Sequence, residues 1–139
     1  MKKTLIKLFI NLHTFFYKLT GGRFGTEMGG NKILLLTTKG RKSGQKFTTP
    51  LVYIDHEEGY LIIASNGGNK NHPDWYYNLK SDPTVGLQIK DKIISAQAEI
   101  LDEAARAPIW KEIVAEAPQY GEYEGRTGRL IPVVWLRTK

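Results

Sequence analysis

The first pattern along the chain is helical. Apolar side chains recur at helical spacing through the first twenty positions, and lysines lie between them. The apolar stripe consists of Leu5, Leu8, Phe9, Leu12, Phe15, Phe16 and Leu19. This spacing predicts an amphipathic helix, and the glycines of residues 21–30 predict a loop after it. We therefore expect residues 1–30 to form one unit and residues 31–139 a second, barrel-forming unit.

Short apolar runs separated by turn residues fill most of the second unit. They predict strands at residues 32–38, 47–54, 60–65, 84–90, 93–101 and 131–136. Because most connections between them are short turns, neighbouring strands should pair antiparallel. The pattern predicts a mainly β, α+β fold with about six antiparallel strands in a small, partly closed barrel and helices around it.

Prolines punctuate the remaining stretches. Pro50 lies inside a predicted strand and has no N–H to donate, so it marks an edge, a bulge or a bend. Residues 73–81 predict a short helix. A longer helix should follow the N-cap residue Asp102, with a kink or a break into two helices at Pro108. Residues 119–129 are polar and predict a linker.

Composition narrows the class of protein. The chain has 139 residues, 41% of them hydrophobic, which is enough for one domain with a proper core. It has no cysteine, which excludes disulfides, thiolate nucleophiles and cysteine-based metal sites and fits the cytoplasm. The net charge of +6 favours an anionic partner: nucleic acid, an anionic membrane or a polyanionic small molecule.

Several common kinds of site are missing from the sequence. His13, His56 and His72 lack partners at metal-ligand spacing, so we predict no metal site. There is no nucleophile elbow, no dinucleotide-binding glycine motif and no phosphate-binding loop of the nucleotide hydrolases. Hydrolytic chemistry of the usual types therefore has no visible equipment.

The segment "GRKSGQK" (40–46) concentrates positive charge between two predicted strands. Gly40 and Gly44 allow backbone N–H groups to converge in an anion-binding nest. Charge comes from Arg41, Lys42 and Lys46, and hydroxyl donors come from Ser43 and Thr48. Such a set suits a phosphate, although a solvated charged turn explains the same residues equally well.

A second cluster lies in "ASNGGNKNHPDWYYNL" (64–79). An apolar strand leads to Ser65, then to two glycines, then to a helix whose N-terminus can point N–H groups at a ligand. Trp75 provides flat apolar surface beside it, or belongs to the core. Further along, Tyr120 and Tyr123 face one side if that segment is helical. Anion-binding turns with aromatic surface and few catalytic side chains suit a protein that holds a planar anionic cofactor.

Three segments resemble the deazaflavin-dependent nitroreductases, also known as quinone reductases dependent on coenzyme F-420. They are "LLLTTKGRKSGQKFTTPLVY", "IIASNGGNKNHPDWYYNLKSDPTV" and "YGEYEGRTGRLIPVVWL", in the same order and spacing from about residue 33 to residue 136. The resemblance implies an FMN-binding-like split β-barrel. It also implies hydride transfer from the reduced 8-hydroxy-5-deazaflavin to a quinone-like or other small organic acceptor.

The resemblance also assigns residues. Cofactor binding falls on Arg41, Lys42, Ser43, Gly44, Lys46, Thr48, Pro50, Leu51, Ile63, Ala64, Ser65, Asn66, Trp75, Asn78 and Tyr120. Within this set, the residues of the hairpin grip the phosphate and glutamyl tail. Ser65 is the candidate hydrogen-bond or proton donor, and Tyr120 and Tyr123 cover the acceptor. Ala117 stands where the drug-activating member has a third tyrosine, which favours quinones over nitro-drugs as acceptors.

Other readings remain open at this point. The same barrel could carry FMN or haem as a carrier or sensor. Nucleic-acid binding is disfavoured because the basic residues gather in one hairpin and one terminal helix instead of tracking a groove. The amphipathic helix either packs on the barrel or lies on anionic lipid through residues 2–19. We therefore expect a monomer or homodimer in the cytoplasm, with the inner face of the plasma membrane as the alternative location.

Overall fold

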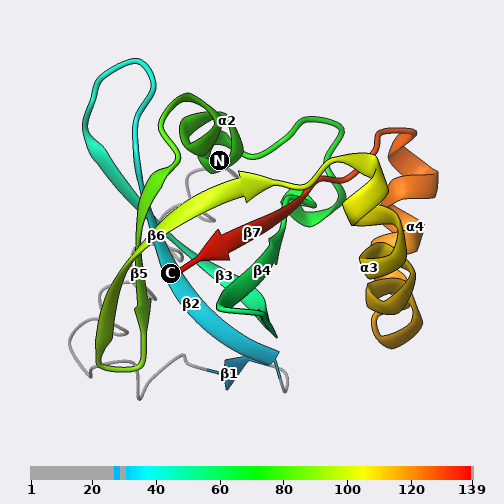
Figure 1. Cartoon of the computed structure of the whole chain (residues 1–139). Coiled ribbons are helices and arrows are strands. Elements are labelled where there is room, and N and C mark those ends of the chain that lie inside the picture. The colour runs from blue at the N-terminus through cyan, green and yellow to red at the C-terminus, as the bar shows by residue number, and fades with distance from the viewer. Residues whose placement is uncertain (1–26, 29–30, 139) are drawn as a thin grey trace.

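The computed structural model describes residues 27–28 and 31–138 (Figure 1). The strands are β1 (Glu27–Met28), β2 (Asn31–Lys39), β3 (Lys46–His56), β4 (Gly59–Ile63), β5 (Thr84–Ile89), β6 (Lys92–Ile100) and β7 (Val133–Arg137). The helices are the short 3-10 turn η1 (Asn66–Gly68), α2 (Asp74–Ser81), α3 (Glu103–Glu116) and α4 (Pro118–Thr127). The predicted amphipathic helix, and the boundary proposed at residue 30, lie outside the described residues.

The strands form one antiparallel sheet that closes on itself. Its order is β2-β3-β4-β7-β6-β5, and a further pairing of β2 with β5 completes the barrel. The register at closure places Leu36 opposite Leu87 and Thr37 opposite Gly86. The predicted barrel of antiparallel strands is therefore confirmed. The two-residue strand β1, which pairs with β2, falls where the sequence predicted a loop.

Pro50 lies on an open edge of this barrel. β3 pairs with β2 from Lys46 to Val52, but its pairing with β4 begins only at Tyr53. Residues 46–52 of β3 therefore have one neighbouring strand among the described residues. Since an edge position does not need the missing N–H of a proline, the structure selects the edge among the three alternatives.

Two apolar clusters hold the fold together. The larger one fills the barrel and includes Leu34, Ile62 and Val134, each 0% exposed. The smaller one lies outside the barrel, where Leu61 and Val133 pack against Ile113 of α3. Figure 1 shows α3 and α4 side by side at one end of the barrel, while α2 lies beside the β2–β3 hairpin. The surface between the hairpin and α4 is therefore the candidate location of a binding site.

The prediction of a linker at residues 119–129 is wrong, and of the two alternatives at Pro108 the break into two helices is excluded. Pro108 lies within a single helix, α3, because both Pro108 and Ala104, whose carbonyl loses its partner, are exposed and that carbonyl can bind water. The expected linker is helix α4, which begins at Pro118, ends at Thr127 and is followed by the left-handed C-cap residue Gly128. Gly121 allows it to approach α3 closely, since an added Cβ would lie 3.0 Å from Val114 Cγ1. Within the described ranges, no helix is long and apolar enough to cross a membrane.

Candidate functional site

Several backbone N–H groups of the hairpin tip already have hydrogen-bond partners. Gly40 N–H donates to Gln45 O at 2.7 Å, and Gly44 N–H donates to Gly40 O at 2.9 Å. The N–H of Arg41 donates to Asn78 Oδ1 at 3.2 Å. Of the two glycines, only Gly44, with φ of +73°, has a left-handed backbone. The N–H groups of Gly40, Arg41 and Gly44 therefore already have partners, while no described partner accepts from those of Lys42 and Ser43, and the backbone nest at the tip stays a prediction.

Arg41 fastens the tip to helix α2. Its Nη1 donates to Asn78 Oδ1 at 2.8 Å and to the backbone carbonyl of Asp74 at 3.4 Å. Its guanidinium lies over the Tyr77 ring, 5.2 Å from the centroid. Asn78 is buried and donates in turn to Thr38 Oγ1 at 3.3 Å. Asn78 thus joins the hairpin, β2 and α2 through one side chain.

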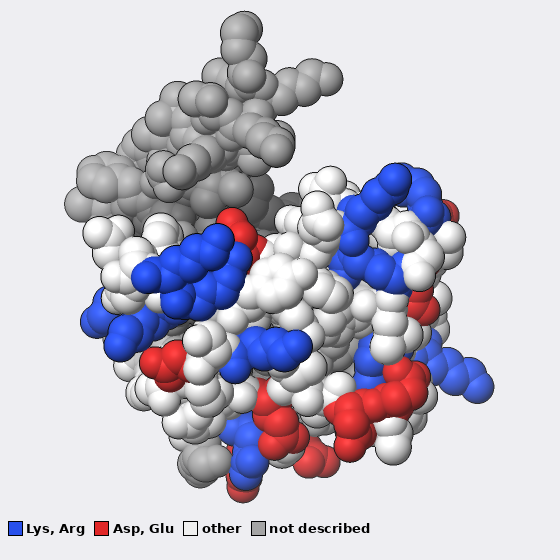
Figure 2. Space-filling model, turned by 90° about the horizontal axis from the view of Figure 1, so that it is seen from above, with Lys and Arg blue, Asp and Glu red and all other residues white. Residues whose placement is uncertain are grey.

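The lysines of the tip are exposed instead. Lys39 and Lys46 face each other across the two strands, and Lys42 projects from the turn between them. Like charges on directly opposite strand positions repel, so an anion bound between them would relieve that repulsion. Ser43 Oγ is already the acceptor for the N–H of Gln45, at 3.2 Å. Figure 2 shows blue side chains gathered over the hairpin at the left and again toward α4 at the right, with largely uncharged surface between.

The loop after β4 has the backbone geometry of an anion-binding site. Ser65 is right-handed, and Asn66, with φ of +51°, is left-handed, which is the combination that makes an anion-binding concavity. The N–H groups of Ser65, Asn66 and Gly67 donate to no group in the described part of the chain. The Ser65 hydroxyl likewise has no described partner. These donors remain available to a ligand.

Arg129 supports this loop, and the sequence analysis missed it. It lies between α4 and β7, and its Nη2 donates to Ser65 O at 2.8 Å and to Ala64 O at 3.2 Å. Its Nε donates to Asn69 O at 3.0 Å, and Nη1 lies 2.9 Å from His72 Nδ1. The only signal in the sequence is a charged residue directly before an apolar strand.

A line of contacts connects this loop to the hairpin. His72 packs against the Tyr77 ring at 5.8 Å, and Tyr77 carries Arg41 on its face. On its other side His72 meets Arg129. The cationic tip and the free N–H groups near Ser65 therefore belong to one continuous surface.

Helix α4 covers the far side of the loop. Tyr120 and Tyr123 lie on α4 with ring centroids 6.0 Å apart. A Cβ on Gly68 would lie 2.8 Å from Tyr123 Cδ1 and would overlap Arg126, so α4 packs directly on the glycine turn. Burial, and then the neighbouring Tyr123, raise the pKa of Tyr120, which keeps its hydroxyl protonated at neutral pH.

A buried ion pair holds α4 in place. Arg106 of α3 is 3% exposed, and its Nη2 lies 2.6 Å from Glu124 Oε2. Its Nε donates to Ile131 O at 2.8 Å, and its guanidinium lies 4.4 Å from the Trp110 centroid. Because Ile131 follows Arg129 closely, this pair also fixes the segment that carries Arg129.

Comparison with known proteins identifies the family. Residues 9–138 match the protein family described as F420H(2)-dependent quinone reductase. This chain belongs to that family. An F420H(2)-dependent quinone reductase of Mycobacterium tuberculosis is 39% identical over 132 residues, which cover 91% of this chain and 88% of that protein.

Two solved structures agree with this assignment. An F420-H2 dependent reductase is 42% identical and superposes with a TM-score of 0.67, covering 76% of this chain and 93% of that one. A structure described as a domain-swapped dimer is 33% identical, with a TM-score of 0.71, and covers 99% of this chain and 100% of that one. The predicted membership of a family of F-420-dependent quinone reductases is confirmed.

The remaining residues suggested by the family resemblance divide between surface and core. Thr48 and Leu51 lie on the open edge of β3, and the Thr48 hydroxyl is 2.9 Å from that of Thr37. Trp75 and Ala64 are buried in the barrel cluster, so packing accounts for them, while Ile63 packs in the cluster beneath α3 and α4. Ala117, the C-cap residue of α3, is half-buried.

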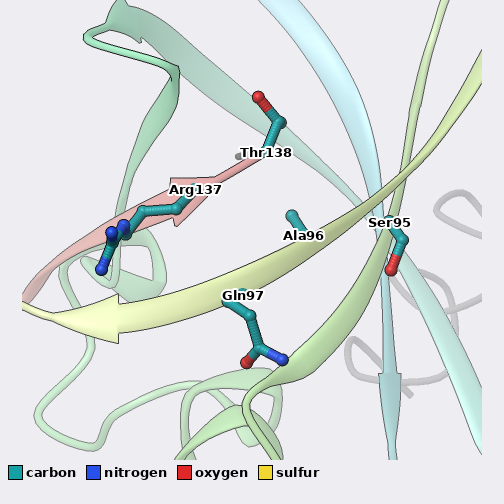
Figure 3. A pocket seen from close by; sticks show the side chains of 5 residues that line it. All are labelled: Ser95, Ala96, Gln97, Arg137 and Thr138. Atoms are coloured by element: carbon teal, nitrogen blue, oxygen red, sulfur yellow. The ribbon is translucent and has the colours of Figure 1, made fainter.

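A separate hollow lies elsewhere on this reductase. It has a volume of about 320 Å³ and is lined by Ser95, Ala96, Gln97, Arg137 and Thr138 (Figure 3). Thr138 bonds to Glu58 in the β3–β4 turn, which lies at the opposite end of β3 from the hairpin tip. Its cation, Arg137, already faces Glu99 at 3.4 Å. We therefore assign no part of the site to this hollow. No group of three or more metal-ligating side chains occurs among the described residues.

Proposed function

We propose that this chain is an oxidoreductase that transfers a hydride from reduced coenzyme F-420 to a quinone-like acceptor. The observation that carries the proposal is membership of the F420H(2)-dependent quinone reductase family over residues 9–138. The relative from Mycobacterium tuberculosis, named for this activity, matches almost the whole chain. Coenzyme F-420 is accordingly the cofactor.

The described residues fit the acidic end of such a cofactor at the hairpin. Lys39, Lys42 and Lys46 are exposed, and two of them face each other with unrelieved like charge. Arg41 is held by α2 yet its side chain is still 31% exposed, so it can add one contact. We assign the phosphate and the glutamyl tail to this group of cations.

The loop after β4 fits the ring end. The free N–H groups of residues 65–67 and the Ser65 hydroxyl can donate to ring oxygens. Bound there, the reduced cofactor supplies a hydride, and the quinone takes up that hydride and one proton to become a hydroquinone. Ser65 and Tyr120 are the hydroxyls that we assign to proton donation, and Tyr120 with Tyr123 covers the acceptor.

The direct test mixes purified full-length protein with reduced F-420 and menadione and follows oxidation of the cofactor by absorbance. We expect a saturable rate, and quenching of F-420 fluorescence on binding. If the protein shows neither a saturable rate nor fluorescence quenching, the proposal is refuted. A protein that purifies yellow with bound FMN, or with the absorption band of haem, and shows no F-420 turnover would establish the carrier alternative instead.

Replacement of Ser65 by alanine tests the role of its hydroxyl. Placing reactants in a near-attack geometry contributes about 7–11 kcal/mol in well-oriented systems, far more than one hydroxyl contributes. We therefore expect Ser65→Ala to slow turnover without abolishing it. A loss as complete as that caused by omitting the cofactor would show instead that Ser65 is an essential acid.

Two finer features of this proposal concern partners. A homodimer is one candidate assembly, since one relative is described as a domain-swapped dimer. Contact with anionic membrane through residues 2–19 is motivated by the lysines of that segment and the lipid solubility of quinones. Removal of residues 1–19 should abolish flotation with anionic liposomes, and unchanged flotation would exclude this contact.

A further inference from the structure

Arg129 uses its guanidinium entirely on one loop. Nε and Nη2 donate to the carbonyls of Asn69, Ala64 and Ser65, at 3.0, 3.2 and 2.8 Å respectively. The planar fork of an arginine offers five donors in fixed directions, which suits several carbonyls converging on one point. The remaining partner, His72, lies 2.9 Å from Nη1. One side chain thus ties together both ends of the loop.

The loop needs an external tie because its own backbone is costly. Asn66, Gly67 and Gly68 have φ values of +51°, +62° and +82°, so three successive residues are left-handed. Asn66 in particular carries a Cβ that disfavours this conformation. Inside the loop, the Asn66 side chain donates to Asn71 O at 2.9 Å, and Gly68 N–H donates to Ser65 O at 3.0 Å. Arg129 supplies hydrogen bonds from outside it.

The direction of these bonds determines what the loop presents. The carbonyls of Ala64 and Ser65 accept from Arg129, and the N–H of Ala64 donates to Pro132 O at 3.0 Å. Arg129 and Pro132 therefore occupy these three groups. The N–H groups of residues 65–67 and the Ser65 hydroxyl have no described partners. A loop that lost this tie would be free to turn the same donors elsewhere.

We propose that Arg129 is a positioning residue: it holds residues 64–69 and His72 in the arrangement that presents the Ser65 hydroxyl and the free N–H groups to the cofactor ring. This inference rests on the proposed function for the identity of the ligand. The holding of the loop is independent of it. Because a guanidinium only donates, His72 Nδ1 must accept, so the neutral ring carries its proton on Nε2.

His72 makes the tie sensitive to pH. Besides Arg129, it faces Tyr76 at 4.6 Å and Tyr77 at 5.8 Å, both from α2. Burial, then Arg129, then Lys80 lower the pKa of His72. A protonated ring would lose its acceptor nitrogen and repel the guanidinium. The contact between Arg129 and His72 therefore requires a neutral His72, which is the form that burial, Arg129 and Lys80 favour.

The test compares Arg129→Met, Arg129→Lys and Arg126→Met in the full-length protein. Arg126 lies on α4 over the Tyr123 ring and makes a single hydrogen bond to the loop, to Gly68 O at 3.5 Å, so Arg126→Met matches the loss of charge without the loss of the contacts of Arg129. The first measurement is hydrogen exchange without cofactor. In Arg129→Met, the amides of Ala64, Gly68 and Asn69 should exchange at least tenfold faster, with a smaller change in Arg129→Lys and none in Arg126→Met.

Two further measurements separate positioning from general loosening. The pKa of His72, followed by NMR, should rise in Arg129→Met and stay in place in Arg126→Met. Turnover of reduced F-420 with menadione should fall at least tenfold in kcat for Arg129→Met, while the Kd for F-420 changes less than threefold, because the lysines of the tip still hold the acidic tail. Arg129→Lys should restore part of the rate.

The outcomes are distinct. Unchanged exchange at the three amides in folded Arg129→Met would show that Arg129 does not hold the loop and would overturn the inference. Faster exchange with undiminished kcat would overturn the link between the loop and the reaction. If Arg129→Met does not fold, Arg129→Lys carries the same comparison. Wild-type protein without turnover would refute the proposed function, while the exchange and pKa results would still decide whether Arg129 ties the loop.

Discussion

Removing the Asn78 side chain should detach the hairpin tip from helix α2. Asn78 is 4% exposed, accepts from the N–H and Nη1 of Arg41 at 3.2 and 2.8 Å, and donates to the Thr38 hydroxyl at 3.3 Å. Asn78→Ala therefore leaves the N–H of Arg41 and the hydroxyl of Thr38 without these partners, and Thr38 is 2% exposed. Each neutral hydrogen bond contributes about 1 kcal/mol, and the bond to the guanidinium about 1 kcal/mol after allowance for its exposure to water.

These terms add to about 3 kcal/mol of lost stability for Asn78→Ala. For a chain of 139 residues this corresponds to a fall in Tm of roughly 12 °C. Arg41→Ala removes only the side-chain contacts and should lower the free energy of unfolding by about 1 kcal/mol. Since the two side chains share one hydrogen bond, the double variant should lose about 3 kcal/mol, about 1 kcal/mol less than the sum.

Urea denaturation of the four proteins, followed by circular dichroism, measures this coupling. Lys42→Ala serves as the control, because Lys42 is exposed beside Arg41 and makes no contact with α2 among the described residues. It should change the free energy of unfolding by no more than about 0.5 kcal/mol. Strictly additive losses for Arg41 and Asn78 would refute the shared bond. A loss of less than about 1 kcal/mol for Asn78→Ala would show that the hydrogen bonds of Asn78 do not hold the hairpin tip to α2.

Three further predictions follow from the site. Gly68→Ala should lower the free energy of unfolding by about 3 kcal/mol, because its Cβ would collide with α4. Gly67 is also left-handed but faces open space, so Gly67→Ala should lower the free energy of unfolding by about 1 kcal/mol, and thermal melts compare the two variants. Glu124→Ala should lower it by about 3 kcal/mol, the low end for a broken buried pair, since Arg106 loses its contact at 2.6 Å but keeps Glu103 at 3.7 Å, and Glu124→Gln by less because an acceptor remains; urea titration measures both. The folded state disfavours the charged form of His72, whose ordinary pKa is 6.5, so stability should decline as pH falls below that value, and His72→Asn should flatten the decline in melts across this range.

The barrel was predictable because its strands carry their own signals. Alternation in residues 84–90 and the apolar run at 32–38 each predicted a strand that the structure contains, as β5 and β2. Pro50 predicted an irregularity and lies on the open edge. These signals are local in the sequence, so no knowledge of tertiary contacts was needed to read them.

Helix α4 could not be predicted in the same way. Gly121 and Gly125 lower its intrinsic helix propensity, and the polar residues around them resemble a linker. What stabilises it is tertiary: Glu124 reaches Arg106, and Gly121 fits against Val114. Neither contact leaves a pattern in the sequence, because the partners lie on another helix.

The candidate site shows the same division. Positive charge at residues 40–46 and glycines at 67–68 drew attention to two segments where the structure has exposed lysines and left-handed backbone, and their role in binding stays a prediction. The sequence could not say which cations are free, because that depends on α2 folding back onto Arg41. Nor could it show that Asn66 is left-handed and that the N–H groups of residues 65–67 lack described partners.

Arginine and lysine have separate tasks in this molecule, and their chemistry explains why. Arg41, Arg106 and Arg129 each direct a planar fork at acceptors within the protein, where several fixed donors order several segments at once. Lys42 and Lys46 are exposed and have no ion-pair partner among the described residues, and a lysine is a compact point charge on a flexible stem. A flexible polyanionic tail needs charge more than it needs a fixed geometry, whereas a ring that passes a hydride needs the opposite. We therefore propose that the arginines fix the segments around the reaction site and that the lysines hold the acidic tail of the cofactor.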